Sequence, residues 1–349
     1  MIFYTGSYTE KDGPAAHPSG KGIGCFDFNN KTGAIKLLGY TKQRNPSYVV
    51  ISDDKKHLYA CEELFERQNP KVHSYKIGEN GALQLINCQA LKGDFACHLA
   101  LFQDILVVSN YVSGNVLSFP VSGNGELAPY TQLIQHEGTG PNKKRQETAH
   151  AHMVYPFGKN SMYVADLGID TVKAYRLSDT GKWDAVHEMD IHIEAGAGPR
   201  HMLLDRDKSI AYILGELSSE IFVLQQFDNS YIQVQKRSCL PKGFNGTHGA
   251  AALRIHPGKK FIYASVRGAD LIAIFKIEEK TGFLEIVEFQ PTMGKSPRDF
   301  NIHPDGQWLI AANQDSDQMI VYEIDRETGM LSKKSVFEVE TPVNITWLY

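Results

Sequence analysis

Histidine, glutamate and arginine side chains that could together transfer a proton and bind an anion are present in this sequence. His150 and His152 are separated by one residue, so in a strand both would point to the same side. An imidazole titrates near neutral pH and can accept a proton from water. Glu216 could polarise water or hold an arginine, and Arg200 and Arg267 offer planar forks of donors for an oxyanion or a carboxylate. We expect these residues to form the catalytic group, and the sequence leaves the base open among His150, His152 and Glu216.

A short basic segment lies just before the histidine pair. It contains Lys143, Lys144 and Arg145, which could anchor a phosphate or a carboxylate of the substrate. Solvated loop positions are the simpler interpretation for the two lysines. We therefore expect Arg145 to be the anion contact of this loop.

The overall composition excludes several partner classes. Lysine and arginine total 36 against 40 acidic residues, a formal charge of −4, so we expect neither nucleic acid nor a membrane as a partner. A local arginine cluster could still hold a small anionic substrate. The five cysteines have no C-x-x-C spacing, which favours free thiols in a reducing cytoplasm, and the start of the chain lacks the pattern of a secretory signal.

A β-repeat of about fifty residues runs through the whole chain. Each copy has an apolar strand, a polar turn, a second apolar strand, and two further strands joined by a turn. The copies start near Pro46, Ala96, His150, Pro199, Ala250, Pro297 and Pro342. Seven starts predict an all-β fold, a single seven-bladed β-propeller over residues 1–349 with four antiparallel strands per blade.

The last copy has only one strand before the chain stops at Tyr349. The segment Ile2 to Thr5 and the hairpin after it would supply the missing strands, so that the N- and C-terminal strands close the last blade. Such a closure removes exposed sheet edges. A closed propeller needs no partner for stability, so we expect a monomer.

The expected topology brings two sets of residues to one end of the central channel. The start of each first strand and the end of each second strand lie on the same face. The first set includes His150, His152, Arg200, His201 and Arg298, and the second includes Glu62, Asn110, Asp166, Glu216, Arg267 and Gln314. His256 and His303 belong to turns on the opposite face, so we expect structural roles for them.

These motifs resemble those of the lactonase family of seven-bladed propellers, which includes 6-phosphogluconolactonases and carboxy-cis,cis-muconate cyclases. The resemblance rests on segments in family order along nearly the whole chain: Gly140-Pro141-Asn142, Arg145-Gln146, His150-Ala151-His152, Ala165-Asp166-Leu167-Gly168, Gly198-Pro199-Arg200-His201, Gly215-Glu216-Leu217, Arg267-Gly268, Ser296-Pro297-Arg298 and Ala311-Ala312-Asn313-Gln314-Asp315-Ser316-Asp317. The resemblance and the expected topology together predict a substrate-binding set of Arg145, Gln146, Asp166, His201, Arg298 and Gln314. The position of Ala252 usually carries an acid in this family, so the acid expected here is Glu216 or Asp166.

The resemblance implies a carboxylic ester hydrolase acting on a sugar lactone, with 6-phospho-D-glucono-1,5-lactone as the expected substrate. The alternatives are a carboxymuconate cycloisomerase, which would bind its carboxylates with the same arginines, and a non-catalytic propeller that binds other proteins. We expect no cofactor and no metal. His150 and His152 could bind a metal together with Asp166 or Glu216, but the sequence has no H-x-x-x-H or cysteine-rich metal spacing.

Overall fold

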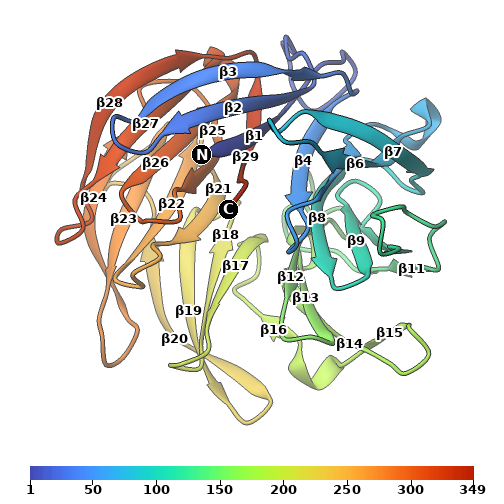
Figure 1. Cartoon of the computed structure of the whole chain (residues 1–349). Coiled ribbons are helices and arrows are strands. Elements are labelled where there is room, and N and C mark those ends of the chain that lie inside the picture. Colours follow the sequence, from blue (N-terminus) through green and yellow to red (C-terminus); the bar gives the residue numbers. More distant parts are fainter.

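The computed structural model describes all 349 residues as seven β-sheets arranged around a channel (Figure 1). In each sheet the first strand of the repeat is innermost and the following strands pair outward, antiparallel throughout. The innermost strands are β4 (Pro46–Ile51), β8 (Ala96–Phe102), β12 (Ala151–Pro156), β17 (Pro199–Asp205), β21 (Gly249–Ile255), β25 (Pro297–Ile302) and β29 (Pro342–Trp347). The predicted propeller and its repeat starts are confirmed.

The second and third strands make up the middle of each blade. The second strands are β5 (His57–Glu62), β9 (Ile105–Asn110), β13 (Ser161–Asp166), β18 (Ile210–Gly215), β22 (Phe261–Arg267), β26 (Trp308–Asn313) and β1 (Ile2–Ser7). The third strands are β6 (Lys71–Ile77), β10 (Asn115–Pro120), β14 (Thr171–Leu177), β19 (Glu220–Phe227), β23 (Leu271–Ile277), β27 (Gln318–Ile324) and β2 (Ile23–Asn29). Both are buried between neighbouring blades, and this explains their nearly continuous apolar runs.

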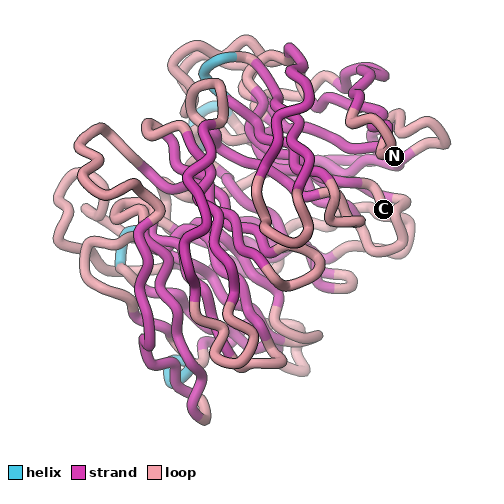
Figure 2. Tube along the Cα trace, turned by 90° about the vertical axis from the view of Figure 1, so that its left-hand side faces the viewer, coloured by secondary structure: helices cyan, strands magenta, loops and turns pink.

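The outermost strands are mostly exposed or half-buried because they form the outer edge of each blade. They are β7 (Leu83–Ala90), β11 (Gln132–Gln135), β15 (Trp183–Ala185), β20 (Ser230–Ser238), β24 (Leu284–Pro291), β28 (Leu331–Glu338) and β3 (Ala34–Thr41). In the third blade, β16 (Ile191–His192) also pairs with β14. The four helical segments are single 3₁₀ turns: η1 (Glu66–Gln68), η2 (Leu167–Ile169), η3 (His187–Met189) and η4 (Gln314–Ser316) (Figure 2). None has the length and apolarity to cross a membrane.

We number the blades by their first strands, from blade 1 at β4 to blade 7 at β29. Blade 7 is shared between the two ends of the chain, as predicted. The C-terminal β29 pairs antiparallel with the N-terminal β1, and the two strands lie side by side in red and dark blue (Figure 1).

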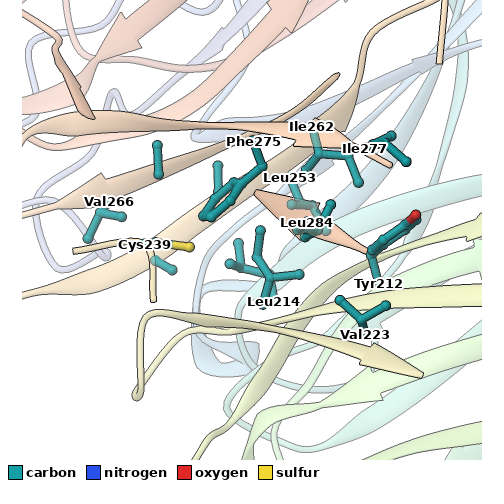
Figure 3. Packing of buried hydrophobic residues seen from close by; sticks show 14 of the residues in the cluster. Tyr212, Leu214, Val223, Cys239, Leu253, Ile262, Val266, Phe275, Ile277 and Leu284 are labelled. Carbon is teal, nitrogen blue, oxygen red and sulfur yellow. The ribbon is translucent and has the colours of Figure 1, made fainter. Parts of the chain in front are cut away.

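Apolar side chains of adjacent blades pack against one another and hold the ring together. Between blades 4 and 5, Tyr212 and Leu214 meet Leu253, Ile262 and Phe275 in a fully buried cluster (Figure 3). Burial of this kind contributes roughly 25 cal/mol per Å² of apolar surface. The blades are therefore fixed relative to one another, and side chains from different blades can form one site.

Tyrosines of the second strands add a repeated hydrogen bond between blades. The hydroxyl of Tyr212 donates to the carbonyl of Gly282, and that of Tyr263 donates to Gly329. Both glycines follow a threonine in the turn before the outermost strand, with φ of 70° and 76°, a backbone conformation that favours glycine. The glycine turns therefore also make contacts between neighbouring blades.

Candidate active site

The site is built at the end of the channel where the first strands begin, which we call the mouth. In every blade the pairing of the first and second strands shifts register next to this end. Such a bulge re-aims the side chains beside it. It allows His152, Arg200 and Arg298, which follow the strand starts, to line a cavity at the mouth.

The residue just after each second strand completes the mouth. In several blades its backbone N–H donates to the carbonyl of the residue that precedes the first strand. Examples are Glu63 to Asn45 at 3.0 Å and Glu216 to Gly198 at 2.7 Å, and Tyr111 and Gln314 repeat the pattern. Glu63, Tyr111, Glu216 and Gln314 are therefore equivalent positions.

In three blades the predicted position is wrong by one residue. Glu62, Asn110 and Asp166 were expected at the mouth, but they are the last residues of their strands. Glu62 instead contacts His73, with Oε1 3.0 Å from Nε2, and Glu63 lines the cavity. Successive side chains of a strand point to opposite sides. An error of one residue therefore selects a side chain that points away from the mouth.

Glu216 lies at the centre of an arginine cluster drawn from three parts of the chain. Arg145 donates to Oε1 at 2.7 Å, Arg267 Nη2 lies 3.1 Å from Oε1, and Arg200 Nε lies 3.0 Å from Oε2. Burial opposes ionisation of this carboxyl, but Arg267, Arg200 and Arg145 outweigh it and hold the pKa of Glu216 well below its usual range. Glu216 is therefore a permanent anion that holds three guanidiniums in place.

His152 and His201 line the cavity as neutral imidazoles. Burial, followed by the charge of Arg200, lowers the pKa of each well below its usual value. His201 Nε2 lies 3.0 Å from Arg200 Nη1, and its Nδ1 accepts from the backbone N–H of Leu253 at 3.3 Å. The buried Nδ1 of His152 has no hydrogen-bond partner. His152 therefore keeps a ring nitrogen unpaired within the protein, whereas His201 supports Arg200.

His150 does not line the cavity, although it neighbours His152 in the sequence. Its ring stacks on Tyr111 at 4.7 Å between centroids, and its Nδ1 lies 2.9 Å from the carbonyl oxygen of Tyr111, the geometry of an N–H donor. The hydroxyl of Tyr111 in turn accepts from Arg145 at 3.0 Å. The structure thus separates the two histidines that the sequence grouped as a catalytic pair, and His150 lies behind Tyr111.

Asp166 and Gln146 lie behind the site and have no exposed surface. Asp166 accepts from the backbone N–H groups of His150 and Gly168 and pairs with His136, whose Nδ1 is 2.7 Å away. Gln146 donates to Leu167 and Asp170. Their expected substrate contacts are not available in this structure, because their polar atoms are already used to fix the loops around His150.

The remaining expected residues occupy the rim and the blade interfaces. Arg145 exposes 44% of its side chain, Lys143 and Lys144 are exposed, and Gln314 is buried with an unpartnered Oε1. Ala252 is fully buried in the apolar cluster between blades 5 and 6. The missing family acid therefore leaves no gap in the mouth.

A second cluster at the mouth, formed by Tyr8, Glu63 and Arg298, was not predicted from the sequence. The hydroxyl of Tyr8 donates to Glu63 Oε2 at 2.8 Å, and Arg298 Nη2 lies 3.5 Å from Oε1. Arg298 also lies over the ring of Tyr8. These residues come from blades 7, 1 and 6, and the available signal was the alignment of Glu63 with Glu216 as the first residue after a second strand.

The charges of the mouth favour an anionic ligand. The five arginines Arg145, Arg200, Arg254, Arg267 and Arg298 face three carboxylates, those of Glu216, Glu63 and Asp299, which leaves an excess of positive charge. Arg298 makes no hydrogen bond to the protein, so its donors are free for a ligand. No group of three or more His, Cys, Asp or Glu side chains in the chain has an arrangement that would hold a metal ion.

Comparison with known proteins identifies the family of this propeller. The family model described as lactonase, 7-bladed beta-propeller, matches residues 2–347. The 6-phosphogluconolactonases of Bacillus subtilis and Formosa agariphila are 32% and 31% identical, over 86% and 85% of this chain and 84% and 85% of theirs. The structure of the periplasmic gluconolactonase of Pseudomonas aeruginosa is similar with a TM-score of 0.91 and 28% identity, covering 99% of this chain and 98% of that one. The chain therefore belongs to the lactonase family of seven-bladed β-propellers.

Proposed function

We propose that this protein hydrolyses 6-phospho-D-glucono-1,5-lactone to 6-phosphogluconate at the mouth of the channel. Lactone hydrolysis follows from the family and from the relatives named for that activity. The observation that carries the phosphorylated substrate is the excess of arginine over glutamate at the mouth, because a phosphate brings the negative charge that this cluster lacks.

The side chains of the mouth match the needs of the reaction. Arg298 has free donors inside the cavity, and neutral His152 can donate a hydrogen bond without carrying a charge. Both suit the carbonyl oxygen, on which negative charge develops as water attacks. Arg145 is exposed at the rim and suits the phosphate, while Glu216 fixes the arginines.

The proposal includes a cytoplasmic monomer without a cofactor. The five cysteines form no disulfide, which fits a reducing compartment. The ring is closed by its own ends, so all charged groups of the mouth come from one chain.

The test is acid release from freshly prepared 6-phosphogluconolactone, followed in a weakly buffered indicator solution against the spontaneous rate. We expect acceleration by the protein and a lower kcat/KM for unphosphorylated glucono-1,5-lactone. An unchanged spontaneous rate for both lactones would overturn the proposal. Equal kcat/KM values for both lactones would contradict a preference for the phosphorylated substrate, but the protein would still be a sugar lactonase.

A further inference from the structure

Lactone hydrolysis needs a group that takes a proton from the attacking water. The cavity at the mouth contains few groups that could do so, and their hydrogen bonds distinguish them. The carboxylates at or beside the cavity are Glu63, Asp299 and Glu216. The imidazoles that line it are those of His152 and His201.

In two of the three carboxylates, each oxygen lies within about 3.1 Å of at least one donor group of the protein. Both oxygens of Glu216 contact arginines. Asp299 accepts from Arg254 at 2.8 Å with Oδ1, and from the side chain of Asn344 and the backbone of Ile345 with Oδ2. A proton on either carboxylate would weaken these contacts, and the three arginines around Glu216 make it a weak base by stabilising its ionised form.

The imidazoles and the thiol of the cavity are poor acceptors for physical reasons. A proton on His152 or His201 would be buried beside Arg200, and the low pKa of both rings reflects that cost. A neutral imidazole of this kind suits hydrogen-bond donation to a carbonyl oxygen. Cys97 also lines the cavity, but burial raises the pKa of its thiol to about 12.

Glu63 differs from all of these groups in having one fixed and one open oxygen. Oε2 accepts from Tyr8, whose hydroxyl stays protonated because burial raises its pKa. Oε1 has no hydrogen-bond donor and faces Arg298 at 3.5 Å. The backbone is fixed on both sides, since Glu63 N–H donates to Asn45 O and the Asn45 side chain donates to Glu63 O. The carboxylate is thus held in position with one oxygen free for a water.

We propose that Glu63 is the general base of the lactonase reaction, positioned by Tyr8 and Arg298. Its open oxygen takes a proton from the water as the water oxygen bonds to the lactone carbonyl carbon. The bond from that carbon to the ring oxygen then breaks, and the protonated Glu63 returns the proton to the ring oxygen. Water is thereby added across the ester bond, Glu63 ends ionised, and the new carboxylic acid releases its proton to solvent. This assignment rests on the lactonase function proposed above.

The experiment is chemical rescue of a truncated side chain. Glu63→Ala removes the base and leaves space for a small carboxylate, so we expect kcat to fall about 100- to 10,000-fold. Added formate should restore kcat in a saturable manner. Glu63→Gln should lose the same activity without rescue, because its side chain fills the space.

The neighbouring Glu62→Ala is the matched control. Glu62 is the adjacent buried glutamate at the end of β5 but pairs with His73 and Arg44 outside the cavity, so the kcat of the variant should stay within about threefold of the wild type. Circular dichroism and thermal unfolding of each variant verify that it is folded. Tyr8→Phe should lower kcat by a smaller factor than Glu63→Ala, because it removes only the hydrogen bond that orients the base.

If the wild-type protein is active, any of three results would overturn the assignment of Glu63. They are an unchanged kcat in Glu63→Ala, a change confined to KM, or a loss of kcat in folded protein that formate does not restore. If the wild type hydrolyses only an unphosphorylated lactone, the same comparison with that substrate tests Glu63 independently of the phosphate. If it hydrolyses no lactone, the proposed function and this assignment both fail.

Discussion

Arg145, on the loop that leads into blade 3, donates to Glu216 of blade 4 with 2.7 Å between Nη2 and Oε1. Arg200 and Arg267 contact the same carboxylate from blades 4 and 5. One buried anion thus connects three regions of the mouth. Its removal would leave three guanidiniums close together without their shared counter-charge, and Arg200 among them is buried.

We expect Glu216→Gln to lower the free energy of unfolding by about 3 kcal/mol at neutral pH, because it leaves the buried Arg200 without its counter-charge. Urea unfolding monitored by tryptophan fluorescence measures this change. Glu220→Gln is a control in the same blade, since Glu220 makes only a partly exposed ion pair with Lys236 at 3.5 Å. Equal stabilities of both variants would contradict a central role for Glu216.

The same carboxylate predicts how stability depends on pH. The pKa of Glu216 is lower in the folded protein than in the unfolded chain, so its ionised form stabilises the fold. This contribution is complete above about pH 5 and is lost as the pH falls toward the folded-state pKa. The difference in unfolding free energy between wild type and Glu216→Gln should therefore shrink on acidification. A difference that grows at low pH would contradict the assigned ionisation.

The buried histidines of the channel should remain neutral well into the acid range. Burial and nearby arginines lower the pKa of His98 to about 3 and those of His152 and His201 well below their usual value. Nitrogen chemical shifts of these rings should stay constant from about pH 8 to pH 5, while free histidine in the same sample titrates. If the His152 ring gained a proton in this range, His152 would compete with Glu63 as the candidate for the general base.

Salt should weaken binding of a charged substrate at the mouth but not the chemical step. Raising sodium chloride from about 50 to 500 mM screens the arginine cluster, so KM for 6-phosphogluconolactone should rise several-fold while kcat stays nearly constant. The KM of glucono-1,5-lactone, which is uncharged, is the internal control. If KM had the same salt dependence for both lactones, the arginines would not be the groups that bind the charge of the substrate.

Asp166→Asn tests the support behind His150. Asp166 accepts two backbone hydrogen bonds and contacts His136, all fully buried, so the amide should cost about 2 kcal/mol of stability by leaving a buried polar group badly paired. Thermal unfolding measures the loss, with Asp184→Asn at an exposed position of strand β15 as the control. Full stability would show that His150 is positioned without Asp166.

The sequence determined the propeller, the blade count and the closure of blade 7, since these follow from periodic apolar strands and turn residues. His256 and His303 also form the expected turn contacts: His256 Nδ1 accepts from Gly258 N–H, and His303 Nδ1 lies 2.8 Å from Asp305. The repeat likewise located Arg200, Glu216 and Arg298 at the mouth. Local patterns were sufficient for the strands, the turns and the number of repeats, because these depend on residues close together in the chain. The closure followed from counting strands, since the last repeat lacks the strands that the N-terminal segment has in excess.

Only the tertiary structure decided which neighbouring residue faces the channel. The choice of Glu63 over Glu62, of Tyr111 over Asn110, and of His152 over His150 depends on where each strand ends and on the bulge opposite. A shift of one residue reverses the direction of a side chain without changing the repeat. The pairing of Tyr8, Glu63 and Arg298 also joins three blades, and contacts between residues so far apart in sequence exist only once the ring is closed.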